Sequence, residues 1–249
     1  MRFKYSDLLL FILIFVFVAA FPVDLLPIDY AYKLLVLIGL RLMLLSYYIY
    51  IIIKWRIKIF GVENIKNLLF CIPFVLIGFS NIIATKIDGT FGPIVTEPLV
   101  MVFLSILTLL TAITEEIIFR LFIQNALYRT SSVKRIFASA GIFALMHLLR
   151  MVNVSSIDAL ISVLLQTVYT FGLGLLLGVL YEYSHSLVGA IILHFCFNFF
   201  NDTLFTYLNC NPSTLSYYLS AVGTAIIVGI YALLITIFIF RKYNRYYRS

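Results

Sequence analysis

The feature that most constrains this chain is a succession of long apolar runs separated by short polar segments. A helical run of about 17–25 apolar residues is long enough to cross the hydrocarbon core of a bilayer. Reading the chain by this length predicts about eight spans. They lie at Leu8–Leu26, Leu34–Ile53, Leu68–Thr85, Leu99–Gln124, Ile136–Met151, Ile157–Tyr181, Leu187–Leu208 and Leu219–Phe240. The expected fold is therefore all-α, a polytopic transmembrane helical bundle.

The low content of charged residues supports a membrane protein, and the placement of the basic residues predicts its orientation. Only 12% of the residues are charged and 63% are hydrophobic, whereas soluble domains carry about 25% charged residues. Basic residues gather in alternate loops and both termini, as cytoplasmic segments do. We therefore expect a multi-pass cell-membrane protein with cytoplasmic N- and C-termini, and the net charge of +7 needs no nucleic acid partner. Richness in Ile, Phe, Tyr and Asn suggests an AT-biased bacterial genome.

The fourth span carries charged residues that lipid alone does not explain. Glu115, Glu116 and Arg120 lie within an otherwise apolar run, and charged groups at membrane depth persist where they face an interior and serve a function. Four residues separate Glu116 from Arg120, so the two share a helix face and can pair in support of a site. Glu115 points about 100° away from Glu116, so it does not share the face of the Glu116–Arg120 pair and can serve another role.

Two later spans carry their own polar sets. Phe143-x-x-x-His147 lies in the fifth span and His194-x-x-x-Asn198 in the seventh. Counted at 1.5 Å per residue, Glu115 and the two histidines fall roughly 11–18 Å from the cytoplasmic helix ends. The sequence therefore predicts that they meet inside the bundle. Asp202 extends the face of His194 by another turn and is left outside the predicted catalytic set.

These residue types suit hydrolysis by an activated water. Glu115 can take a proton from water and return it, with His147 sharing the proton or holding the water. His194 and Asn198, one turn apart, can donate together to a developing oxyanion. Glu115, His147 and His194 also resemble the ligands of a catalytic zinc, although no His-Glu-x-x-His helix is present. The sequence leaves open zinc-bound and directly activated water, with a slight preference for no obligatory structural metal.

Structural roles compete with each of these interpretations. The Glu116–Arg120 pair can act as a clamp inside the bundle, and an intramembrane His or Asn is commonly an interhelical hydrogen-bond partner. In the sixth span, Gly174 and Gly178 form a Gly-x-x-x-Gly pair that predicts close packing against a neighbouring helix. The same acids and histidines could also form the proton relay of a transporter.

At these residues the sequence resembles the CPBP family of intramembrane proteases, also described as type II CAAX prenyl endopeptidase-like or Abi proteins. That family shows Glu-Glu-x-x-x-Arg, Phe-x-x-x-His and His-x-x-x-Asn or Asp in this order, and all three patterns occur here, each inside a predicted span. The likeness covers residues 99–208, which we expect to form the catalytic core. Residues 1–98 would hold three further spans, and residues 209–249 the last span with a basic tail.

The resemblance implies hydrolysis of a peptide bond within the membrane. Carried across, Glu115 and His147 would activate the water, His194 and Asn198 would stabilise the oxyanion, and Glu116 with Arg120 would support the site. The implied partner is a membrane-associated peptide or protein in the bilayer, in leader-peptide or CAAX-like processing, bacteriocin maturation or self-immunity. The alternative is a non-catalytic immunity or scaffold protein that binds a peptide.

Overall fold

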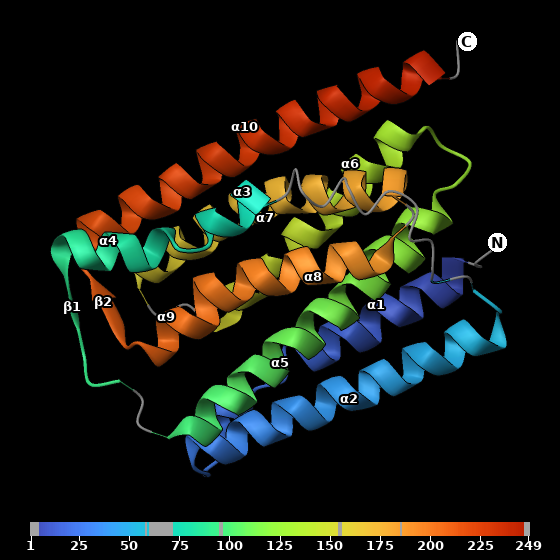
Figure 1. Ribbon diagram of the computed structural model, residues 1–249. Helices are drawn as coiled ribbons and strands as arrows, with labels where there is room; N and C mark the ends of the chain where they lie inside the picture. Colours follow the sequence, from blue (N-terminus) through green and yellow to red (C-terminus); the bar gives the residue numbers. More distant parts are fainter. Residues whose placement is uncertain are drawn as a thin grey trace.

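The computed structural model of the chain is a bundle of long helices (Figure 1). The structure describes residues 5–57, 59, 72–94, 97–153, 156–184 and 186–246. The long helices are α1 (Tyr5–Ala19), α2 (Tyr30–Lys54), α5 (Pro98–Glu116), α6 (Ser132–Met146), α7 (Ile157–Ser184), α8 (Leu187–Asn198) and α10 (Thr214–Tyr246). Shorter elements are α3 (Ile72–Ile77), α4 (Ser80–Asp88), α9 (Leu204–Tyr207) and the antiparallel strands β1 (Gly89–Phe91) and β2 (Cys210–Pro212). Short 3-10 helices occupy Val23–Leu25 and His147–Asn153.

Seven helices in the described part of the chain are long and apolar enough to cross a membrane, which confirms the polytopic all-α fold. The third predicted span differs, because its described part forms α3 and α4 with a break at Gly78 and Phe79. Residues 68–71 of that span lie outside the described residues. A Cβ on Gly78 would come within 3.0 Å of the Phe197 carbonyl oxygen, so the break lies directly against α8.

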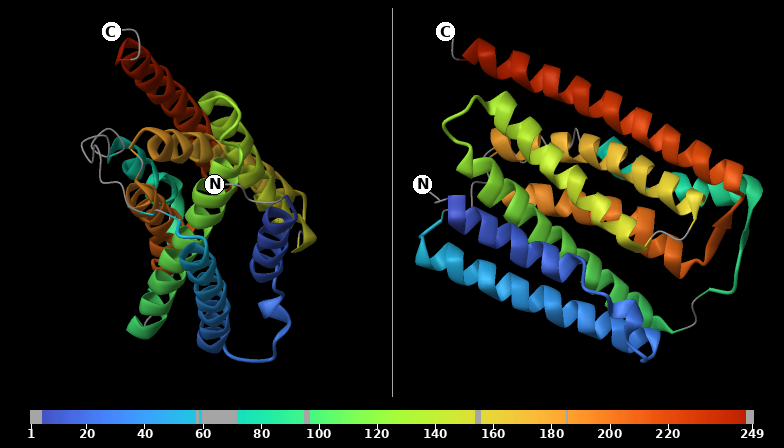
Figure 2. Two further views of the ribbon diagram at one scale, coloured as in Figure 1. Left: turned by 90° about the vertical axis from the view of Figure 1, so that its right-hand side faces the viewer. Right: turned by 180° about the vertical axis from the view of Figure 1, so that it is seen from behind.

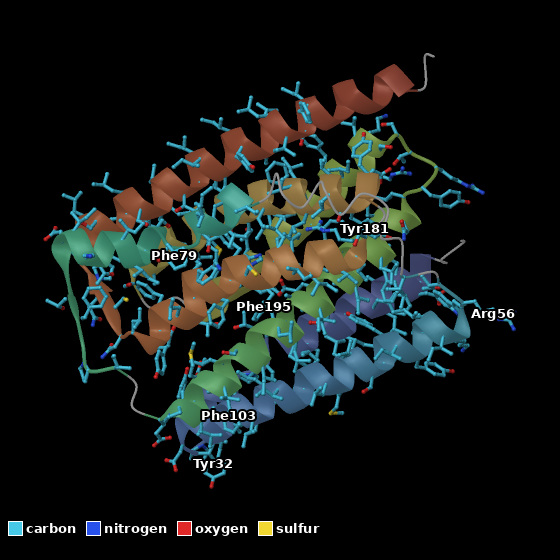
Figure 3. All side chains as sticks on the ribbon, in the orientation of Figure 1. Tyr32, Arg56, Phe79, Phe103, Tyr181 and Phe195 are labelled. Carbon is cyan, nitrogen blue, oxygen red and sulfur yellow. The ribbon has the colours of Figure 1, made fainter. Side chains whose placement is uncertain are left out.

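Helix α1 begins and helix α10 ends at the same end of the bundle (Figures 1 and 2). We call this the terminal end, and the opposite end, which holds β1 and β2, the far end. Arg56 and Tyr181 lie toward the terminal end, whereas Tyr32 and Phe103 lie at the far end (Figure 3). That the chain crosses the membrane an even number of times, with both termini on one side, stays a prediction. That this side is cytoplasmic stays a prediction from the charge pattern.

The bundle is apolar outside and polar at its centre. Glu116 and Arg120 are fully buried and His194 is 1% exposed, while large apolar side chains such as Leu13 and Ile230 face outward. Water would favour the reverse arrangement, whereas lipid favours apolar side chains on the surface. The distribution of side chains therefore supports a bilayer as the solvent of this protein.

Three packed groups of helices position the polar centre. Helix α7 packs against both α6 and α10, α2 packs on α5, and α5 contacts α8. From α1, Phe11 and Phe15 pack on Phe122 and Phe119, with ring centroids 4.9 and 5.5 Å apart. These aromatic contacts fill the space around the end of the fourth span.

Close packing at Gly174 joins α7 to α6, as the Gly-x-x-x-Gly spacing predicts. A Cβ at Gly174 would lie 3.0 Å from the Ala140 Cα and 3.1 Å from the Phe143 ring, and one at Gly178 would lie 3.2 Å from Ile136. Gly141, on α6 itself, has nothing within 4 Å of its Cβ position. Helix α6 therefore approaches α7 only as closely as these small residues permit.

We expect Gly174→Ala to lower the free energy of unfolding by about 1–3 kcal/mol, because the added methyl meets backbone that cannot move aside cheaply. Gly141→Ala is the matched control. It should raise stability by about 0.5–1 kcal/mol, because alanine favours a helix and the space is open. Thermal unfolding of both variants in one detergent provides the comparison, and equal midpoints for the two would contradict the predicted contact.

Candidate active site

Both helices that carry the central polar residues change geometry within a turn of them. Helix α5 begins with Pro98 in its first turn and continues beyond Glu116 as a π-helix, η3 (Ile117–Gln124), in which every residue is buried. Helix α8 is capped by Ser186, the residue before its first turn, whose hydroxyl accepts the Gly189 N–H at 3.1 Å. It continues as a second π-helix, η5 (Phe199–Thr203). Such wide turns occur frequently at functional sites.

Glu116 is the centre of a buried ionic network. Its Oε2 accepts from the Arg120 Nε at 2.9 Å, so the predicted pair one turn apart is present. Its Oε1 lies 2.9 Å from the His194 Nδ1. With both carboxylate oxygens used, Glu116 fixes Arg120 and His194 relative to each other and ties α5 to α8.

The Arg120 guanidinium is held from a third helix as well. Its Nη1 donates to the Ser139 hydroxyl at 3.1 Å, and that hydroxyl donates to the Phe119 carbonyl at 2.7 Å. The guanidinium carbon lies 5.4 Å from the centre of the Phe143 ring. Ser139 was not anticipated by the sequence, because a serine on an apolar helix carries no distinctive local signal.

Glu115 points away from that network, as its place on the helix predicts. Its side chain is 12% exposed, and its Oε2 lies 3.6 Å from the His194 Nε2. The His194 ring therefore stands between two consecutive carboxylates, with Nδ1 on Glu116 and Nε2 toward Glu115. Because Glu116 accepts at Nδ1, Nε2 is the nitrogen of His194 left for the cavity.

His147 is oriented by its own helix end. It follows the last residue of α6, and its Nδ1 lies 3.1 Å from the Phe143 carbonyl oxygen. A carbonyl can only accept, so Nδ1 carries the hydrogen and Nε2 carries the lone pair of the neutral ring. The Phe143 ring is 5.1 Å from the His147 ring and 5.7 Å from that of His194, so this phenylalanine spaces the two imidazoles.

One cavity of about 180 Å³ collects all four predicted catalytic residues. Glu115, His147, His194 and Asn198 line it, while Glu116 and Arg120 lie behind its wall. The sequence-predicted meeting of three helices is thus present in the structure. Other polar side chains from α5, α7 and η5 line the same cavity, namely Thr108, Thr111, Gln166, Tyr169, Thr170 and Asp202.

Two site residues were left unassigned by sequence reasoning. Asp202 lines the cavity one turn beyond Asn198, which the four-residue spacing could have indicated. Arg41, on α2, is close enough to Glu115 for electrostatic attraction, and its Nη1 is buried without a hydrogen-bond partner in the described part of the chain. The sequence signal for Arg41 was its charge in the middle of the apolar second span.

The potential metal-binding side chains that the structure describes do not gather around one point. Among the described residues, no three His, Cys, Asp or Glu side chains are placed to hold a metal ion together. Glu115, His147 and His194 border one cavity but do not converge on a common point as zinc ligands do. The residues as placed do not fit a three-ligand zinc site, and we derive no step through a metal.

The fold and the site together define a polytopic helical membrane protein with a carboxylate–imidazole cluster inside its bundle. Residues 97–200 match a family described as Rce1-like, type II CAAX prenyl endopeptidase. The match confirms the resemblance read from the three motifs and includes every residue from Glu115 to Asn198. It supports a membrane protease. Comparison with curated proteins and with solved structures gave no match.

Proposed function

We propose that this chain is an intramembrane endopeptidase that hydrolyses a peptide bond in a membrane-associated peptide or protein. The observation that carries the proposal is the cavity itself, in which an ionisable carboxylate and two oriented imidazoles face one space inside an apolar bundle. Polar groups of this kind within a membrane protein mark a functional site. Similarity to the type II CAAX prenyl endopeptidases supports peptide-bond hydrolysis as the reaction.

In the proposed reaction Glu115 is the general base. Its carboxylate takes a proton from a water molecule, and the water oxygen attacks the carbonyl carbon of the scissile bond. His147, which lines the same cavity, helps to hold the water. When the tetrahedral intermediate collapses, Glu115 returns the proton to the leaving amine. The products are a carboxylic acid and an amine, and the site regains its starting protonation.

His194 and Asn198 stabilise the oxyanion in this proposal. The Asn198 amide donates directly, and the His194 Nε2 donates when the ring is an imidazolium. The negative charges of Glu115 and Glu116 on its two sides compensate the charge of that ring. Donors fixed in advance of the reaction stabilise developing charge most effectively, and Glu116 with Arg120 supplies this fixation from behind the cavity wall.

The test is to produce wild type and Glu115→Gln with candidate exported peptides and to compare peptide masses. Leader-peptide processing, CAAX-like trimming and bacteriocin maturation each predict a defined mass loss that requires Glu115. A scaffold or immunity protein predicts unchanged masses. Such a protein would also still protect the cell when Glu115→Ala and His147→Ala are combined. Unchanged peptide masses together with retained protection would contradict the proposal.

We expect cleavage to continue after metal chelation, because the described side chains do not assemble a three-ligand site. The measurement is the cleavage rate in proteoliposomes before and after dialysis against a strong zinc chelator, with a known zinc peptidase in the same buffer as the control. Loss of cleavage that added Zn²⁺ restores would show instead that Glu115, His147 and His194 bind the metal when substrate is present.

A further inference from the structure

A second polar cavity adjoins the catalytic one. It has a volume of about 240 Å³ and lies between α4, α7, η5 and α10, with the polar lining residues Asn81, Ser162, Gln166, Asn201, Tyr217 and Thr224. Gln166, Tyr169 and Asp202 line both this second cavity and the catalytic cavity. The two spaces are therefore neighbours along the same helices, with Asp202 at their junction.

The wall of the second cavity is a connected polar network. The Ser220 hydroxyl donates to the Asn81 Oδ1 at 2.8 Å, and the Asn81 Nδ2 donates to the Asn201 Oδ1 at 3.0 Å. The Asn201 Nδ2 in turn donates to the Asp202 Oδ1 at 3.2 Å. Three segments far apart in the sequence thus hold polar side chains around one space within the helical bundle. Inside a membrane protein such groups are costly unless they face water or a polar ligand.

The cavities continue to the far end, and carboxylates lie along the path. A third cavity, of about 310 Å³, shares Ala159, Ser162 and Tyr217 with the second and includes Asp158 beside β2. The carboxylates of Glu115, Asp202 and Asp158 therefore follow one another along the path. Among the described residues that line these three cavities, none is a lysine or arginine.

We propose that the second cavity is a substrate subsite and that Asp202 selects a positively charged side chain of the peptide there. The proposal rests on the proposed function, since it assigns to the second cavity the part of the substrate on the far-end side of the cleaved bond. A cleft with one sign of charge and low-dielectric walls concentrates ligands of the opposite sign.

The position of Asp202 determines how far the recognised peptide residue lies from the scissile bond. Asp202 lies one helical turn, about 5.4 Å, beyond Asn198, the predicted oxyanion donor. An extended peptide advances about 3.3 Å per residue. The lysine or arginine recognised by Asp202 is therefore about two residues from the scissile bond.

A first experiment measures the charge of the second cavity without any substrate. Ala221, which lines the cavity from α10, is changed to cysteine in the full chain after replacement of Cys71, Cys196 and Cys210 by alanine. In proteoliposomes, the rates of modification by a cationic and an anionic methanethiosulfonate reagent are compared. We expect the cation to be favoured by about tenfold relative to Thr90→Cys, a site on the exposed strand β1.

Variants of Asp202 assign this preference to one carboxylate. Asp202→Asn should remove most of the cation preference at Ala221→Cys, and Asp202→Glu should retain it, which separates loss of charge from a failure to fold. Glu97→Gln, which neutralises an exposed carboxylate before α5, should leave the ratio unchanged. A ratio equal to that of Thr90→Cys, or one that Asp202→Asn does not alter, would overturn the proposal.

A second experiment links the charge to cleavage. Single-span peptides that differ only in lysine, glutamine or glutamate two residues from the cleaved bond are incubated with each variant, and the products are weighed by mass spectrometry. Wild type should favour lysine, Asp202→Asn should lose the preference, and Asp202→Lys should favour glutamate. Cleavage that persists in Glu115→Gln would remove the proposed function, whereas an unchanged lysine preference in Asp202→Asn would remove only the subsite.

Discussion

Replacing Glu115 by glutamine is expected to reduce the cleavage rate by about 10²–10⁴-fold, the usual contribution of a positioned general base. Glutamine has nearly the same shape but cannot accept the proton of the attacking water. The fold should tolerate the change, because Glu115 faces the cavity and Glu116, not Glu115, forms the buried pair with Arg120. Loss of activity with retained stability is therefore the expected signature.

The measurement combines product masses with the unfolding midpoint of the purified variant in detergent. Glu97→Gln is the matched control, since it makes the same chemical change on an exposed residue just before α5, and it should cleave at the wild-type rate. Normal processing by Glu115→Gln would remove the base from the proposed reaction and with it the hydrolase interpretation.

Replacing Arg120 by methionine should destabilise the protein by about 3–5 kcal/mol, because it leaves the charge of Glu116 buried without its guanidinium. Arg120 and Glu116 are both fully buried and joined at 2.9 Å. The loss of Arg120 also removes the contact with Ser139 on α6, so the helices that carry the two imidazoles lose a common support. We expect cleavage to fall along with stability.

A second change distinguishes loss of the pair from loss of packing. Adding Glu116→Gln to Arg120→Met removes the uncompensated charge and should recover much of the lost stability, while the glutamine carbonyl can still accept from His194. Thermal unfolding of the two single variants and the double variant gives the interaction energy. If Arg120→Met alone unfolds at the wild-type midpoint, the pair does not stabilise the bundle.

Most of the helices were predictable, because the length and hydropathy that a membrane-spanning helix needs are local properties of the sequence. The predicted sixth span, Ile157–Tyr181, is observed as Ile157–Ser184, and the fourth, Leu99–Gln124, as α5 followed by η3. Run length and hydropathy suffice for such spans, since lipid demands a continuous apolar helix with its backbone groups satisfied internally. The third span was less predictable, because its break at Gly78 reflects a close approach to α8 that no local pattern encodes.

The relations within the site likewise divide into those that helical spacing predicts and those that only helix packing sets. Four-residue spacing alone places Glu116 beside Arg120 and turns Glu115 aside, because the geometry of one helix fixes both relations. Spacing did not indicate that Glu116 also binds His194, 78 positions further along the chain. Nor could it bring Arg41 toward Glu115 or place Asp202 between two cavities, since these relations depend on how separate helices pack.

The sequence by itself determined that this chain is a helical membrane protein with acids and imidazoles on three spans, because hydropathy and helical periodicity are properties of neighbouring residues. Only the tertiary structure decided which of these groups face one cavity, which stand behind its wall, and that a second acidic space adjoins the first. The packing of α4, α5, α7, α8 and α10 sets those positions through contacts between residues far apart in the chain, and no single helix specifies them.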